Sequence, residues 1–131
     1  MKRERVNKAR NLGTLSEAAY WGKVRSALRN AFRYWRPGIA ALKAAERPNQ
    51  SANARLRYEY QCGECQEWKP RKQVQIDHIV PCGSLRSGAD LEGFLKRLTP
   101  ESPEAYMVLC KICHQQKTTH ERDARTKDNT R

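Results

Sequence analysis

The stretch that decides the fold is a pair of short motifs, Cys62-Gly-Glu-Cys65 and Cys110-Lys-Ile-Cys113. In each motif two intervening residues let the chain curl so that both sulfurs reach one ion, and two such motifs complete a tetrahedral thiolate shell. A filled tetrahedral shell leaves no position open for a substrate. The spacing therefore predicts a structural Zn²⁺ site whose ligands are Cys62, Cys65, Cys110 and Cys113.

Residues 66–109 separate the two motifs, which is a longer stretch than simple zinc ribbons have, so it must hold structure of its own. The residue pattern predicts strands at 73–78 and 106–109, with a short helix at 91–98 between them. A strand at 58–61 leads into the first motif, and a final helix follows the second motif towards Arg122. The fifth cysteine, Cys82, is interpreted as a small buried residue.

Upstream of the cysteines the pattern is helical. Ser16 is the expected N-cap, and the apolar residues that follow recur at three- and four-residue steps. Pro37 ends this helix and can open a second one that continues to about Glu46. Residues 48–54 are rich in Asn, Gln and Ser and are interpreted as a linker. The apolar face of the first helix consists of Trp21, Val24, Leu28, Phe32 and Trp35.

Positive charge is concentrated in the same N-terminal part. The chain of 131 residues has a formal net charge of +12, and positions 1–57 hold fourteen Lys and Arg residues against three Glu residues, a net +11. Positions 58–131 hold twelve basic and eleven acidic residues, a net +1. This asymmetry predicts a polyanionic partner that binds residues 1–57. The expected contacts lie on one stripe of the first helix and are Arg25, Arg29, Arg33 and Arg36.

Composition also restricts the class and the location of the protein. No stretch approaches the roughly 20 apolar residues that a membrane span requires, and the first residues lack the apolar segment of a secretion signal. We therefore expect a cytoplasmic protein without a membrane partner. The expected fold class is α+β, with a basic helical leader at 1–57, a zinc-stapled module at 58–122 and a polar tail at 123–131.

Three further side chains are candidates for chemistry. Asp77 and His78 end the predicted strand ahead of Pro81, and His114 directly follows the second cysteine motif. A zinc site that holds the strand region against the final helix would bring these three side chains into one cleft.

Residues 58–122 resemble an HNH endonuclease of the ββα-metal type. Residues 16–47 resemble, more loosely, the helical leader of small phage-encoded HNH proteins, which act in an infected bacterial host cell. The main resemblance rests on Asp77-His78-Ile79-Val80-Pro81, on Val108-Leu109-Cys110-Lys111-Ile112-Cys113-His114, and on Lys117-Thr118 with Glu121.

The resemblance implies hydrolysis of DNA to 5′-phosphate and 3′-hydroxyl ends. It implies that Asp77 and His114 hold a catalytic Mg²⁺ or Mn²⁺ and that His78 is the general base, while Lys117 joins the expected DNA contacts. The residue types agree with these roles. An aspartate oxygen with one imidazole leaves coordination positions for water and phosphate oxygens, and histidine titrates near neutral pH, so His78 can accept a proton.

Ala105 departs from the family, which often has an asparagine five places before the third cysteine. In the family that asparagine holds the base and its loop, and here a main-chain carbonyl, Glu104 or Ser102 is left to do so. Two other functions stay open: a non-catalytic zinc-containing module that binds nucleic acid, which Ala105 favours, and a protein-binding component of a phage assembly. A monomer that nicks one strand and a homodimer that cuts both are equally open.

Overall fold

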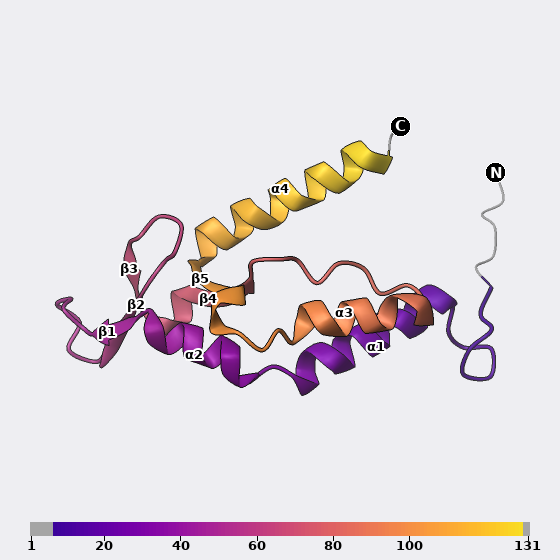
Figure 1. The fold of residues 1–131 in the computed structure, drawn as a ribbon, viewed down its shortest axis with the longest axis horizontal. Coiled ribbons are helices and arrows are strands. Elements are labelled where there is room, and N and C mark those ends of the chain that lie inside the picture. The colour runs from indigo at the N-terminus through magenta and orange to yellow at the C-terminus, as the bar shows by residue number, and fades with distance from the viewer. Residues whose placement is uncertain (1–6, 130–131) are drawn as a thin grey trace. The chain divides into compact units, whose positions relative to one another are not determined.

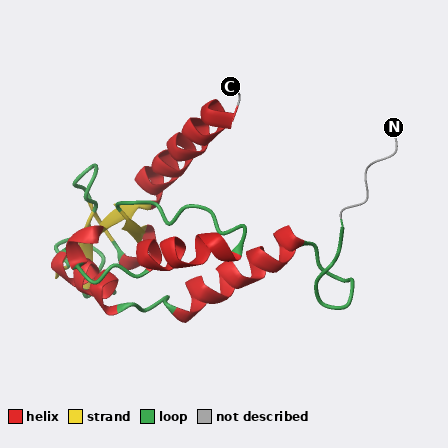
Figure 2. Cartoon of the chain, turned by 45° about the vertical axis from the view of Figure 1, so that its right-hand side comes forward, coloured by secondary structure: helices red, strands yellow, loops and turns green. Residues whose placement is uncertain are grey.

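The computed structural model describes the backbone of residues 7–129 and the side chains of residues 7–123. This part is a mixed helix-and-sheet structure with four α-helices and two small antiparallel sheets (Figures 1 and 2). It divides into two compact units. The first holds the chain up to Trp35 together with Val80–Pro100, and the second holds Arg36–Ile79 together with the chain from Glu101 onwards. In the described range no helix is both long and apolar enough to cross a membrane.

The second unit is built on two sheets. One sheet has three strands, β1 (Glu46–Pro48), β2 (Tyr58–Gln61) and β3 (Trp68–Lys69), and the other pairs β4 (Val74–His78) with β5 (Tyr106–Cys110). In the β4–β5 ladder, Val74 lies opposite Cys110 and His78 lies opposite Tyr106. The helices of this unit are α2 (Arg36–Ala44) and α4 (Lys111–Asn129), and α4 leaves directly from the end of β5 (Figure 1).

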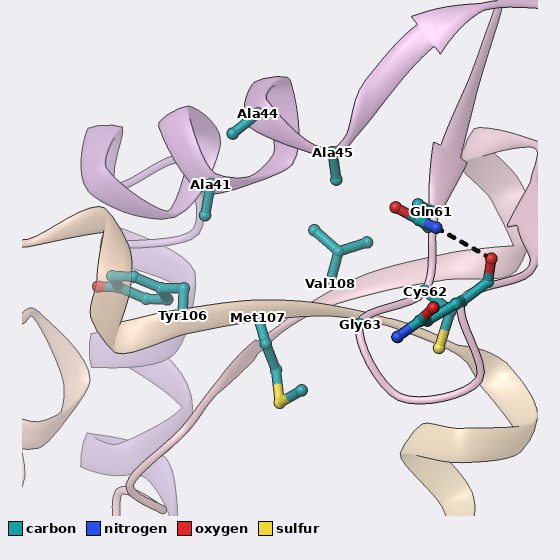
Figure 3. A pocket seen from close by; sticks show the side chains of 10 residues that line it. Ala41, Ala44, Ala45, Gln61, Cys62, Gly63, Tyr106, Met107 and Val108 are labelled. Atoms are coloured by element: carbon teal, nitrogen blue, oxygen red, sulfur yellow. Dashed lines mark hydrogen bonds between the residues drawn. The ribbon is translucent and has the colours of Figure 1, made fainter.

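The two faces of the β4–β5 ladder have different neighbours. Helix α2 approaches one face so closely that a Cβ on Gly38 would lie 3.4 Å from Ile76 Cγ2 and 3.5 Å from Tyr106 Cε1. Figure 3 shows Val108 pointing towards the alanines of α2, while Met107 points to the opposite side of the strand. This alternation follows from the period of two along a strand. The α2 face contributes to a core of Leu42, Tyr60, Val74 and Val108, with Ala45 and Ile76 packed against it.

The first unit is a pair of helices, α1 (Glu17–Ala31) and α3 (Leu91–Leu98), that lie side by side (Figures 1 and 2). Ser16 caps α1 as expected, because its Oγ accepts a hydrogen bond from Ala19 N at 3.1 Å. Trp35 Nε1 donates to Pro100 O at 3.0 Å and so joins the two chain segments of the unit. The predicted apolar face is confirmed for Trp21, Val24, Leu28 and Phe32, which pack on a core of Cys82, Leu85, Phe94 and Leu98. Trp35, the fifth predicted residue, lies beyond the end of α1.

The structure confirms the predicted strands at 58–61 and 106–109 and the predicted helix at 91–98. It also confirms the strand predicted at 73–78, which begins one residue later, at Val74. The short 3-10 helices Arg71–Gln73, Gly88–Asp90 and Pro103–Ala105 complete the elements. The predicted linker at 48–54 is wrong at its start, because Glu46–Pro48 pairs with β2 as an edge strand. Proline is tolerated at a sheet edge, where its missing N–H costs no ladder bond.

Two helix boundaries also differ from the prediction. Helix α1 ends at Ala31, so Arg33 and Arg36 do not continue its stripe of arginines. The reason is Pro37, which is compatible only with the first turn of a new helix and requires the preceding one to end earlier. Helix α4 continues to Asn129, so most of the predicted polar tail is helical, and residues 130–131 lie outside the described range. The predicted domain boundary near residue 57 stays a prediction.

The side chain of Phe94 is completely buried in the core of the first unit. Phe94→Ala should lower the free energy of unfolding by about 3–5 kcal/mol, through lost burial and the cavity that remains. Leu12→Ala is the matched control, because Leu12 is fully exposed. Chemical denaturation followed by circular dichroism measures both. Equal effects of the two substitutions would contradict the described packing.

Candidate functional site

The four cysteines of the two motifs form one cluster. Cys62 follows β2 and Cys65 lies in the turn before β3, while Cys110 ends β5 and Cys113 lies in the first turn of α4. Their Sγ atoms all lie within 4.8 Å of one another, and the Cys65 and Cys110 sulfurs are 3.9 Å apart. Tetrahedral zinc with Zn–S bonds of about 2.3 Å requires sulfurs roughly 3.8 Å apart. The cluster could therefore hold a metal ion such as zinc, and the predicted grouping is confirmed.

Backbone hydrogen bonds shape the first knuckle. Gln66 N donates to Cys62 O at 2.9 Å, and Gln66 takes a left-handed φ of 62° to close the turn. Gly63 N donates to Val108 O at 2.7 Å, which fixes the knuckle to β5. A Cβ on Gly63 would lie 3.3 Å from Val108 O and from Met107 Cε, so this approach leaves little room for a side chain.

The thiols of the cluster perturb one another. Burial alone would raise the pKa of the Cys62 thiol, but backbone N–H groups, led by those of Cys110 and Cys65, lower it to about 6. A hydrogen bond with the Cys110 side chain, together with burial, raises the pKa of Cys113 to about 12. One thiolate is therefore favoured and the ionisation of a neighbour is opposed. Binding of a cation by all four sulfurs would release the protons that remain on the thiols.

A second group of side chains lies between β4 and α4. His114 Nε2 is 3.9 Å from Asp77 Oδ1, and Lys117 Nζ donates to Asp77 Oδ2 at 2.5 Å. The same ammonium donates to the main-chain oxygen of His78 at 2.7 Å. All three side chains are partly accessible, with exposed fractions of 19% for Asp77, 33% for His114 and 26% for Lys117. The structure thus brings together Asp77 and His114, as predicted, and adds Lys117 to them.

The contact between Lys117 and Asp77 has a signal in the sequence. Residues three apart on a helix share one face, so His114 and Lys117 must both face the strand that carries Asp77. Glu121 continues this face one turn further, and its Oε1 lies 3.6 Å from Lys117 Nζ. Interpreting Lys117 only as a DNA contact overlooked its ion pair with Asp77.

His78 lies on the other face of the ladder. Its ring centroid is 5.0 Å from that of Tyr106, its cross-strand partner, and Tyr106 contacts the α2 side. Successive residues of a strand point to opposite faces, so Asp77 turns towards α4 and His78 away from it. The three predicted residues therefore converge on the end of β4 without sharing one face.

A main-chain carbonyl holds the backbone after His78. Ile79 N donates to Ala105 O at 2.9 Å, so Ala105 contributes through its backbone, whatever its side chain. The Glu104 carboxylate accepts a hydrogen bond from the Ser102 hydroxyl, which lowers the pKa of Glu104, and both residues are exposed. Of the three groups considered, a main-chain carbonyl, Glu104 and Ser102, the carbonyl, that of Ala105, is the one that bonds to Ile79.

The predicted DNA contacts differ in exposure. Arg29, Arg33 and Arg36 are exposed, whereas Arg25 is partly buried.

Comparison of the chain with protein-family models, curated proteins and solved structures finds no match. The case for a function therefore rests on the geometry of the two clusters.

The cysteine cluster generates a prediction about stability. Cys62→Ser or Cys113→Ser should abolish zinc binding and unfold the second unit, because a structural zinc contributes on the order of 10 kcal/mol of folding free energy. Cys82→Ser is the matched control, since Cys82 is a buried cysteine of the first unit. Metal analysis and thermal denaturation provide the readouts. Wild-type protein purified without about one zinc per chain, or a Cys62 variant with an unchanged thermal transition, would contradict the site.

Proposed function

We propose that the chain is a metal-dependent DNA endonuclease with an HNH-like site and a structural zinc. The observation that carries this proposal is the juxtaposition of Asp77 Oδ1 and His114 Nε2, 3.9 Å apart, at the point where β4 meets the first turns of α4. The cysteine cluster lies at the start of the same helix, so a metal there would hold the two side chains in this relation.

The donor set fits a hard divalent cation. Asp77 offers a carboxylate oxygen and His114 an imidazole nitrogen, and both are accessible enough to leave the remaining coordination positions to water and phosphate. Mg²⁺ or Mn²⁺ bound there would offset the negative charge that develops on the phosphate and on the leaving oxygen. The products would be 5′-phosphate and 3′-hydroxyl ends.

The position of His78 suits a base that acts from the opposite side of the substrate. Because β4 ends at His78, a phosphate that crosses the end of the strand can be reached by Asp77 from one face and by His78 from the other. His78 would accept the proton of the attacking water, an effect typically worth 10²- to 10⁴-fold in rate. The hydrogen bond from Ile79 N to Ala105 O would hold the strand end in place.

Lys117 holds the Asp77 carboxylate and the His78 backbone through one ammonium group. Its bonds to Asp77 Oδ2 and to His78 O join α4 to the end of β4, and it adds a positive charge beside the position proposed for the phosphate. DNA outside the site would be held mainly by the basic residues of the chain up to residue 57.

A non-catalytic DNA-binding module is the second candidate, and a specific observation favours it. The Lys117 ammonium, 2.5 Å from Asp77 Oδ2, already supplies this carboxylate with a cationic partner. The His78 ring packs against Tyr106, as an ordinary structural histidine does. In this alternative the zinc cluster and the basic residues bind DNA, and the Asp77 cluster stabilises the contact between β4 and α4.

The decisive experiment incubates purified zinc-loaded protein with supercoiled plasmid, with and without Mg²⁺ or Mn²⁺. We expect metal-dependent nicking or linearisation by the wild type. Asp77→Asn, His114→Ala and His78→Ala should each lower the rate at least about a hundredfold, while the affinity for DNA stays within a few-fold, because none of them removes a positive charge needed for binding.

His120→Ala is the matched control, since His120 is an exposed histidine on the same helix that is displaced from the His114 face by helical spacing. Its cleavage rate should equal that of the wild type. Undiminished cleavage by His78→Ala would exclude the proposed base. DNA binding without cleavage by the wild type, with either cation, would establish the non-catalytic module instead.

A further inference from the structure

The guanidinium of Arg97, on α3 in the first unit, lies in a slot formed by two glycines. A Cβ on Gly83 would be 3.3 Å from Arg97 Nη2, and a Cβ on Gly93 would be only 3.0 Å from Nη1. Arg97 Nε donates to Cys82 O at 2.7 Å, which fixes the orientation of the planar group. Arg97 as a whole is partly exposed.

Helix formation does not explain why residue 93 is a glycine. It lies inside α3, where glycine is the least favourable residue after proline, and alanine would be the best. The observed slot offers a reason, because with a methyl group there the guanidinium would have to shift by a few tenths of an ångström. Gly83 has a φ of +78°, a conformation that favours glycine, and it too leaves room for the guanidinium.

The fixed guanidinium keeps most of its hydrogen-bonding capacity. Within the described residues, the bond from Nε to Cys82 O is the hydrogen bond formed by this side chain, so Nη1 and Nη2 retain their N–H donors. The two carboxylates of the 80–100 segment have other partners. Asp90 accepts a hydrogen bond from Arg86 N, and Glu92 pairs with Lys96.

We propose that Arg97 is a preorganised phosphate-binding site that contacts the backbone of DNA. A planar fork with its stem fixed and both Nη groups available matches the bidentate geometry of phosphate recognition. The first unit as a whole attracts a polyanion: it contains twelve Lys and Arg residues against four Asp and Glu residues, a net +8. The site rests on the proposed function in taking DNA as its partner, but it does not depend on catalysis.

The site also gives the 80–100 segment a role. This segment lies between β4 and β5 in the sequence, and it carries both Gly83 and Arg97. A phosphate bound by Arg97 would therefore be contacted by a segment continuous with the strand that bears Asp77 and His78. The protein would then bind DNA through α3 as well as through the basic leader.

The test is the affinity for a short DNA duplex, measured by fluorescence anisotropy at several salt concentrations without added divalent cation, so that no cleavage interferes. Arg97→Gln should weaken binding about tenfold and reduce the slope of log affinity against log salt by about 0.9, the value for one phosphate contact. Lys96→Gln is the matched control, because it removes the same charge from an exposed neighbour on α3, and its effect should be clearly smaller.

Gly93→Ala separates the geometry from the charge. It removes no charge but displaces the guanidinium, so it should weaken DNA binding as Arg97→Gln does. In the Arg97→Gln background the same substitution should raise the melting temperature, because the collision is gone and alanine favours the helix. Wild-type affinity and salt slope in a folded Gly93→Ala or Arg97→Gln protein would overturn the proposal and leave Arg97 with a structural role, seen only as a lower melting temperature.

A titration with inorganic phosphate at matched ionic strength distinguishes the two sources of the anion. We expect no competition with DNA at equal salt. Stabilisation of the wild type by phosphate that is lost in Arg97→Gln, together with unchanged DNA affinity, would overturn the assignment to DNA. A wild type that cleaves plasmid while Arg97→Gln binds DNA equally well removes this proposal alone. A wild type that binds no DNA removes the proposed function and this site together.

Discussion

The convergence of four cysteine sulfurs is the constraint on which the second unit depends. Its two sheets have strands of two to five residues, and such short ladders bury too little to be stable alone. The cluster joins the knuckle between β2 and β3 to the end of β5 and the first turn of α4, and the bond from Gly63 N to Val108 O reinforces this junction. A metal bound there would contribute folding free energy directly, because its site does not exist in the unfolded chain.

The same junction sets the direction of α4 and so the composition of the second cluster. Cys113 belongs to the sulfur cluster, and His114 follows it immediately on the helix. Once α4 starts at this place, the helical period turns His114 and Lys117 towards β4, where they meet Asp77. A metal bound by the four cysteines would therefore act on the candidate site through the geometry of a helix start, without contact with the substrate.

The β4–β5 ladder separates the candidate residues as much as it gathers them. It turns Asp77 towards α4 and His78 towards Tyr106. The two side chains therefore do not line one cleft on the same face of the ladder, as the sequence had predicted. The residues meet instead at the end of a strand, where the chain leaves for the 80–100 segment of the other unit. In that segment two glycines and the Cys82 carbonyl orient the guanidinium of Arg97.

Local spacing in the sequence was sufficient for features that depend on near neighbours. The cysteine motifs, the Ser16 cap, the apolar face from Trp21 to Phe32 and the strand ahead of Pro81 all follow from periods and turns of a few residues. Features that depend on a distant backbone partner were decided only by the tertiary structure. Glu46–Pro48 became a strand because β2 offered it a partner, and the Ala105 carbonyl met Ile79 because β4 and β5 paired in one register. The guanidinium slot required Gly83 to meet Arg97 in space. Sequence alone specifies which groups can bond, whereas their pairing depends on which segments the fold brings within bonding distance.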